Sequence, residues 1–118
     1  MRVRTVYFKV QQLGAARAWW EKFLGVQPVK NFERWSEFRV GEINLGLLQI
    51  NGAAGASGAP CVPVLEFADG DIARRIERAK GLGARVVLEG KDHPDYPRIA
   101  AVLVDPFGNE FEVTNLHD

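Results

Sequence analysis

The sequence predicts one α+β domain made of two successive βαβββ modules. Its 118 residues are enough for one hydrophobic core but too few for two independent domains. Strand-like and helix-like hydrophobic patterns follow one another in the same order in both halves. The segment Lys22–Gly25 also matches Lys80–Gly83 at a separation of 58 residues (80 − 22), and the same separation pairs Val6 with Val64.

The first module begins with a strand and a short amphipathic helix. Arg2–Val10 is rich in β-branched and aromatic residues, which is typical of a strand buried on both faces. Apolar residues recur at helical spacing over Leu13–Leu24, and Gly25 lies where a glycine commonly ends a helix. Three more strands are expected, at Gln27–Phe32, Trp35–Val40 and Ile43–Ile50.

The second module repeats this order after a segment dominated by Gly, Ala and Ser. A strand is expected at Cys61–Ala68, and then a helix that Asp69 or Asp71 caps and that runs to about Lys80. The last three expected strands are Ala84–Leu88, Arg98–Val104 and Glu110–Asn115. We therefore expect module 1 at residues 1–50, a linker at 51–60 and module 2 at 61–118.

The composition predicts an ordinary globular chain without a charged partner. Fifteen basic residues balance fifteen acidic ones, so no overall field attracts nucleic acid or an anionic membrane. No apolar run approaches the roughly 20 residues of a membrane helix, and no signal-peptide core is recognisable. The single cysteine, Cys61, excludes a disulfide framework and fits a reducing compartment. We expect a soluble, cytoplasmic protein.

Two motifs carry a resemblance to a known superfamily. The expected first helix ends in WWEKFLG (residues 19–25), and the last hairpin reads VDPFGNEFEV (residues 104–113), which is the more specific motif. With the two βαβββ halves, they make the chain resemble the vicinal oxygen chelate superfamily of glyoxalases, bleomycin-resistance proteins and extradiol dioxygenases. The resemblance covers nearly the whole chain. It implies a curved, U-shaped mixed sheet with helices on its convex side and a ligand cleft on the other side. It also implies a homodimer, in which the modules pair either within one chain or between chains.

The resemblance also implies where a metal ion would bind. Catalytic members commonly hold one divalent metal through a His or Gln near the start of each half and a Glu on the last strand of each half. Of the four corresponding positions here, only Glu112 offers a strong ligand. The other three are Thr5, Gly46 and a residue within Val62–Val64. We therefore expect no metal and no other cofactor, unless a shift in strand register brings Cys61 into a soft-metal site.

Strand alternation predicts which side chains face the cleft. On the last strand Phe111 and Val113 should pack against a helix, which leaves Glu112 on the cleft side. On the first strand Val6, Phe8 and Val10 should pack under the helix. The candidate ligand-binding residues are Thr5, Tyr7, Trp35, Glu37, Arg39, Gly46, Leu48, Tyr96 and Glu112. Such a partly aromatic and partly charged surface suits a small aromatic or amphipathic molecule.

Two residues are candidates for catalysis. Burial in an apolar cleft would raise the pKa of Glu112 and make it a general base, whereas an ion pair with Arg39 would make it structural. His93 lies with Tyr96 in the loop Glu89–Pro97, which in relatives often covers the ligand. Proton transfer by His93 competes with the simpler interpretation of a solvated loop histidine.

Three functions remain open at this point. The first is metal-free binding of a small molecule, similar to the drug-sequestering bleomycin-resistance type, although a neutral chain is poorly suited to cationic bleomycin itself. The second is a lyase, isomerase or dioxygenase that uses Glu112 as a base or metal ligand, with Tyr7 or His93 as its proton partner. The third is a non-catalytic accessory or regulatory module.

Overall fold

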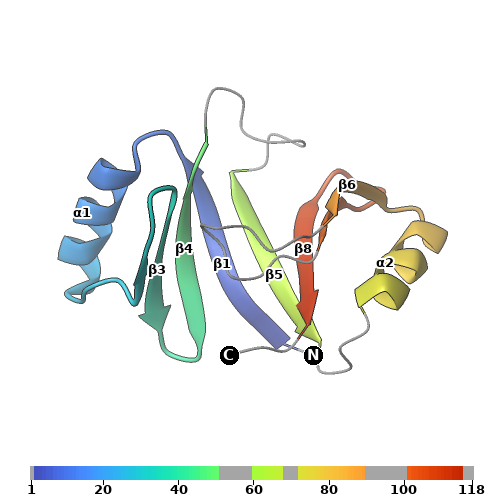
Figure 1. Cartoon of the computed structure of the whole chain (residues 1–118), viewed down its shortest axis with the longest axis horizontal. Coiled ribbons are helices and arrows are strands. Elements are labelled where there is room, and N and C mark those ends of the chain that lie inside the picture. The colour runs from blue at the N-terminus through green and yellow to red at the C-terminus, as the bar shows by residue number, and fades with distance from the viewer. Residues whose placement is uncertain (1, 51–59, 68–71, 90–100, 116–118) are drawn as a thin grey trace.

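The computed structural model describes residues 2–50, 60–67, 72–89 and 101–115, which form one curved, mixed sheet with two helices (Figure 1). The strand order across the sheet is β2-β3-β4-β1-β5-β8-β7-β6. The elements are β1 (Arg2–Val10), α1 (Leu13–Leu24), β2 (Lys30–Asn31), β3 (Trp35–Val40), β4 (Ile43–Gln49), β5 (Cys61–Phe67), α2 (Ile72–Gly81), β6 (Arg85–Glu89), β7 (Ala101–Val104) and β8 (Glu110–Asn115).

The two halves have the same internal arrangement and meet at the centre of the sheet. In the first half β1 lies parallel to β4, and in the second half β5 lies parallel to β8. Strands β1 and β5 run antiparallel to each other and join the halves. The helices flank opposite ends of the sheet (Figure 1). The expected α+β class and βαβββ order are therefore confirmed.

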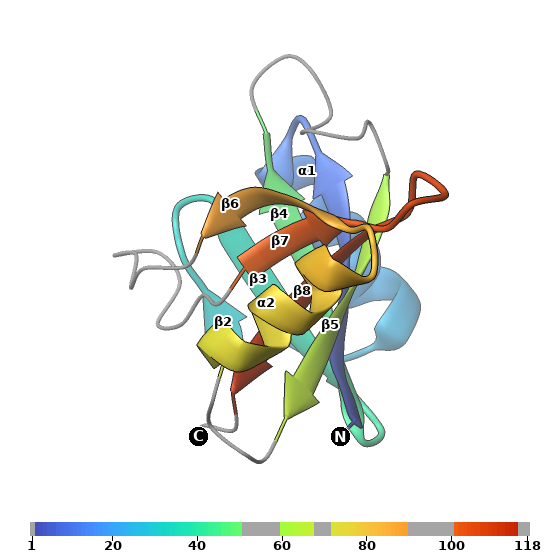
Figure 2. The ribbon, with the colours of Figure 1, turned by 90° about the vertical axis from the view of Figure 1, so that its right-hand side faces the viewer.

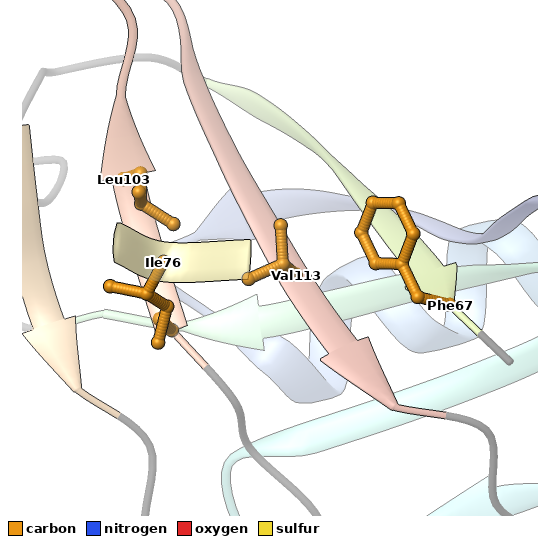
Figure 3. Close-up of a cluster of buried hydrophobic side chains, with 5 residues drawn as sticks. Phe67, Ile76, Leu103 and Val113 are labelled. Atoms are coloured by element: carbon orange, nitrogen blue, oxygen red, sulfur yellow. The ribbon is translucent and has the colours of Figure 1, made fainter. Parts of the chain in front are cut away.

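Each helix covers a separate hydrophobic cluster. Leu13 of α1 packs with Phe38 and Leu47, and Phe8 and Val10 of β1 pack against this cluster. At the other end of the sheet, α2 lies in front of β7 and β8 (Figure 2). There its residue Ile76 meets a second buried cluster (Figure 3). The strand residues of this second cluster are Phe67, Ala101, Leu103 and Val113.

Alternation along the strands leaves a third set of buried side chains on the sheet face that carries neither helix. Tyr7 clusters there with Val62 and Val64, and Trp35 and Leu48 pack against them. We call this face, on which Glu112 also lies beside Val64, the inner face. It is the face on which the sequence predicts ligand binding.

Helix α1 ends as the sequence predicts. Gly25 has φ of +73°, a conformation that glycine adopts without a steric penalty, and its N–H donates to the Glu21 carbonyl at 2.8 Å. Most element boundaries differ from the prediction by no more than a residue or two. Asp69, Asp71 and residues 98–100 lie outside the described residues, as does the expected linker apart from Pro60.

Two expectations about the fold are wrong. Strand β2 covers only Lys30–Asn31 instead of Gln27–Phe32, because it pairs only with β3 at the edge of the sheet and Pro28 has no N–H to donate. The second concerns the 58-residue separation, which pairs Val6 with Val64 although these two residues lie on opposite faces of the sheet. Val64 faces the inner side, whereas Val6, next to inward-facing Tyr7, points to the opposite side.

Among the described residues, neither helix is long and apolar enough to cross a lipid bilayer.

Candidate functional site

Strand register brings Glu112 into the middle of the inner face. Val64 of β5 lies beside Glu112 on one side, and Val102 of β7 lies beside it on the other. Thr5 of β1 is buried one strand further on, next to Val64. The carboxyl group of Glu112 therefore lies on a sheet surface formed mainly by valines.

Glu112 accepts a hydrogen bond from Tyr7 on this surface. The Tyr7 hydroxyl donates to Glu112 Oε1 at 3.2 Å. Burial raises the pKa of Glu112 to about 7; the hydrogen bond from Tyr7 lowers it and the charge of Glu110 raises it further. With a pKa of about 7, Glu112 is divided between its neutral and ionised forms at neutral pH. The alternative ion pair with Arg39 is wrong, because Arg39 lies on β3, four strands away from β8 in the sheet, where its Nη1 donates to Asn44 Oδ1 at 3.3 Å.

An aromatic and polar network extends from Tyr7 to the edge of the first half. The Trp35 ring meets Tyr7 edge to face, with ring centroids 5.4 Å apart. Trp35 Nε1 donates to Glu37 Oε1 at 2.9 Å, and Asn44 Nδ2 donates to Glu37 Oε2. Two neutral donors thus hold the buried carboxylate of Glu37. This network fixes the orientation of the Trp35 ring beside Tyr7.

Gly46 makes room for that ring. A Cβ atom at this position would overlap the Trp35 side chain. Gly46 corresponds to a metal-ligand position in catalytic relatives. Here the space that a side chain at this position would need is filled by Trp35 of the neighbouring strand. Leu48 packs on the same cluster one residue pair further along β4.

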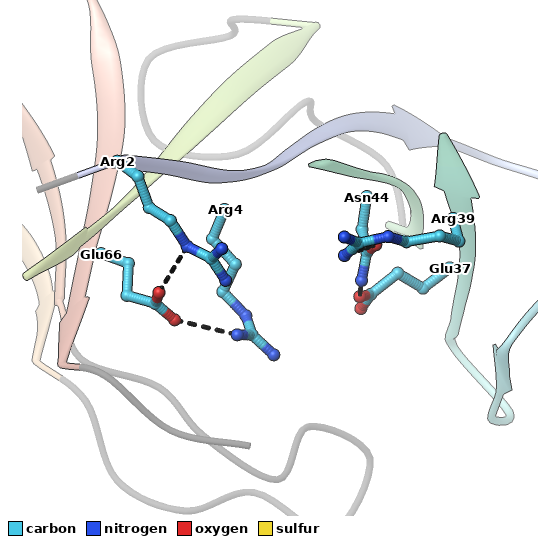
Figure 4. Close-up of polar contacts among 6 residues, drawn as sticks. All are labelled: Arg2, Arg4, Glu37, Arg39, Asn44 and Glu66. Carbon is cyan, nitrogen blue, oxygen red and sulfur yellow. Dashed lines mark hydrogen bonds and ion pairs between the residues drawn. The ribbon is translucent and has the colours of Figure 1, made fainter. Parts of the chain in front are cut away.

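Charged side chains lie at both ends of the inner face. At one end Lys9 Nζ and Glu110 Oε1 form an ion pair of 2.8 Å, and each side chain is 4% exposed. At the other end Glu66, 1% exposed, accepts from Arg2 Nε at 2.7 Å and from Arg4 Nη1 at 2.9 Å (Figure 4). Burial alone would raise the pKa of Glu66, but the bonds and charges of the two arginines outweigh it and lower the pKa.

Strict alternation along the first strand does not predict Arg4 on the inner face. The pairing of β1 with β5 shifts between Val3 and Thr5, so that Arg4 is an extra residue in the ladder. This β-bulge turns Arg4 toward Glu66, on the same face as Thr5, whereas alternation places it under the helix. Glu66 itself carried a usable signal, because it is a lone carboxylate in an otherwise apolar strand.

Two predicted site residues, His93 and Tyr96, lie outside the described residues. The structure brings the others together on one face. Thr5, Tyr7, Trp35, Glu37, Leu48 and Glu112 lie on or beside the central cluster, Gly46 lies beneath Trp35, and Arg39 lies at the edge next to Asn44. Their roles in binding stay predictions.

Among the described residues, those around Glu112 offer few of the donors that hold a catalytic metal ion. Its strand neighbours are valines, its hydrogen-bond partner Tyr7 offers a neutral hydroxyl, and the carboxylate of Glu110, whose charge acts on Glu112, is paired with Lys9. A catalytic zinc site normally takes three protein ligands from His, Cys, Asp or Glu. In the segments that the structure describes, no three such residues lie close enough to share an ion.

A curved sheet made of two βαβββ units, with polar groups on the face without helices, defines the glyoxalase type of domain. Comparison with known families agrees: the glyoxalase-like domain matches residues 5–114. The chain therefore belongs to the glyoxalase-like domain family, and the resemblance to the superfamily is confirmed. No curated protein sequence matches the chain.

Solved structures of this superfamily share the fold. A glyoxalase/bleomycin resistance protein/dioxygenase superfamily member from Vibrio splendidus has a TM-score of 0.65 and 15% identity, with 98% of both chains covered. Methylmalonyl-CoA epimerase from Streptomyces coelicolor, in complex with 2-nitronate-propionyl-CoA, has a TM-score of 0.70 and 19% identity over 98% of this chain and 94% of that one. A Mn(II)-bound glyoxalase from Novosphingobium aromaticivorans has a TM-score of 0.68 and 17% identity over 96% of this chain and 38% of its own. At these identities the likeness concerns the fold.

Proposed function

We propose that this chain binds a small aromatic or amphipathic molecule on its inner face without a catalytic metal. The observation that carries the proposal is the setting of Glu112, whose neighbours are Val64, Val102 and the hydroxyl of Tyr7. Apolar neighbours favour the burial of a ligand, and they give a metal ion too few donors. Trp35, held edge to face against Tyr7, offers an aromatic surface that is already oriented.

Glu112 would give such a ligand a polar anchor. With a pKa of about 7, its carboxyl group is present near neutral pH both as a hydrogen-bond donor and as an acceptor. Both forms can accept from a hydroxyl or amide N–H group of the ligand, and the protonated form can also donate to a carbonyl oxygen.

Metal analysis and ligand-induced thermal shifts test this function. Purified protein should contain no stoichiometric divalent metal, and small aromatic molecules should raise its melting temperature. The variant Glu112→Gln should change that response, whereas Glu77→Gln on the exposed side of α2 should not. One equivalent of tightly bound metal, or a response that is the same in both variants, would contradict the proposal.

A second candidate function is proton transfer by Glu112, and the position of its pKa near neutrality favours it. The ionised carboxylate would take a proton from an acidic C–H bond of the substrate and return it to the same or a neighbouring carbon, as in an isomerase or lyase. Incubation with carbon acids in D2O would reveal such a step as deuterium incorporation. Glu112→Gln should abolish it, and incorporation unchanged in that variant would contradict the role.

We also propose that two copies of the chain associate through the outer side of α1. Trp19 is 57% exposed and Phe23 is 68% exposed, and their rings stack with centroids 5.3 Å apart. With Val26 and Val29 they expose roughly 400 Å² of apolar surface, about half of what each partner buries in a standard interface. The variant Trp19→Glu should therefore sediment as a monomer, and an unchanged sedimentation coefficient would contradict this interface.

A cytoplasmic location, expected from the lone Cys61, stays a prediction.

A further inference from the structure

We infer that the ligand carries a carboxylate group, and that Arg39 binds this group with help from Arg4 at one end of the inner face. The inference rests on the proposed function, because it names the chemical class of the molecule that the inner face binds. It depends on the positions of the two arginines, on the partners of Arg39 and on the distribution of charge along the face.

Strand register places both guanidinium groups over the same end of the sheet. Arg39 of β3 pairs with Asn44 of β4, which pairs in turn with Thr5 of β1. The bulge turns the Arg4 side chain onto this face, beside that of Thr5. Two strand spacings, about 10 Å, separate the β1 and β3 backbones, a gap that two arginine side chains can span from both sides. Figure 4 shows Arg4 and Arg39 over this face, with Asn44 beside Arg39.

Among the residues that the structure describes, Arg39 has an amide and not a carboxylate as its hydrogen-bond partner. In the part of the chain that the structure describes, Arg39 donates to the neutral side-chain amide of Asn44. The nearby carboxylate of Glu37 accepts instead from Trp35 and Asn44, and Glu66 is paired with Arg2 and Arg4. A guanidinium group has five N–H donors in a planar fork that matches a carboxylate. Arg39 is thus held in place at one nitrogen while it keeps donors for a ligand.

The rest of the inner face explains why the ligand would be charged at one end only. Lys9 lies four residues beyond Thr5 on β1, about 13 Å away, and its buried charge is neutralised by that of Glu110. Between the two ends the surface is apolar and aromatic, with Tyr7, Val62 and Val64 at its centre. An aromatic carboxylic acid satisfies both features: its ring would lie on the central cluster and its carboxylate would reach Arg39.

Matched pairs of acids and amides provide the test. Benzoate, phenylacetate and 3-phenylpropionate would be titrated into the protein by calorimetry and compared with their uncharged primary amides, which have nearly the same shape. We expect at least one acid to bind about tenfold or more tightly than its amide, and the affinity of that acid to fall as the ionic strength rises.

Two variants locate the charge that is responsible. Arg39→Gln should weaken binding of the acid by about tenfold or more. It should not affect folding, because Arg39 is exposed at the edge of the sheet. The control Arg78→Gln removes an exposed guanidinium in the last turn of α2 and should leave the affinity unchanged. Arg4→Gln should weaken binding as well, and an unchanged affinity in this variant would remove Arg4 from the site.

The possible failures are distinguishable. Amides that bind as tightly as acids would overturn the carboxylate assignment and leave the proposed function standing. Acids that bind equally well to Arg39→Gln and to the unaltered protein would overturn the site. If neither acids nor amides bind, the proposed function falls together with this inference.

Discussion

The substitution Glu112→Gln should change stability in a way that depends strongly on pH. The pKa of Glu112 rises from 4.5 to about 7 in the folded protein, mainly because of burial. Between these two values the folded state holds a proton that the unfolded state releases, so stability falls as pH rises through this window. Each pKa unit corresponds to 1.36 kcal/mol, and the ionised carboxylate therefore costs the folded state about 3 kcal/mol above pH 7. Glutamine avoids this cost because it has a similar shape and cannot ionise.

Urea unfolding at pH 5 and at pH 8, followed by tryptophan fluorescence, measures the effect. We expect Glu112→Gln to be nearly neutral at pH 5 and to stabilise the protein by about 2–3 kcal/mol at pH 8. Tyr7→Phe removes the hydrogen bond that lowers the pKa of Glu112, so it should move the pH window upward. The exposed Glu77→Gln is the control and should show no such pH dependence. A stability gain that is the same at both pH values would refute the argument from burial.

Two further substitutions test the packing around the site. Gly46→Ala should destabilise the protein by about 1–3 kcal/mol and alter Trp35 fluorescence, since the new methyl group overlaps the ring. The control Gly81→Ala places its methyl group in open space and should be tolerated. Equal stabilities of the two variants would contradict the close approach of Trp35 to Gly46. Lys9→Met should cost about 3–5 kcal/mol in urea unfolding because it removes the cation that is paired with the buried carboxylate of Glu110. The double variant with Glu110→Gln should recover much of the loss if the ion pair is the cause.

Much of the fold could be predicted because alternation and helical spacing are local signals. Phe8 and Val10 pack under α1, and Val113 packs under α2, as their apolar character on one side of each strand indicates. The same rule placed Tyr7 and Glu112 together on the opposite face, where they form a hydrogen bond. These residues follow their strand's regular pleat, so their sequence positions were sufficient.

The parts that escaped prediction depend on contacts between strands. Arg4 reaches the inner face only because β1 and β5 pair with a bulge, and no feature of the first strand alone specifies where the ladder shifts. Likewise, the sequence shows Gly46 as a missing ligand, whereas its neighbour Trp35 on β3 explains why a glycine is required there. Register and side-chain volume across neighbouring strands decided both cases.

The two candidate functions make opposite demands on Glu112, and this separates them. A carboxylate ligand on the inner face would repel the ionised form of Glu112, so its binding should take up a proton and weaken as pH rises through about 7. A general base must instead be ionised before it reacts, so deuterium exchange of a carbon acid should increase through the same pH range. Glu110, whose charge also acts on Glu112, is paired with Lys9. Affinity and exchange rate measured across pH 5–9 therefore distinguish binding from catalysis, and a flat profile for both would mean that Glu112 takes part in neither.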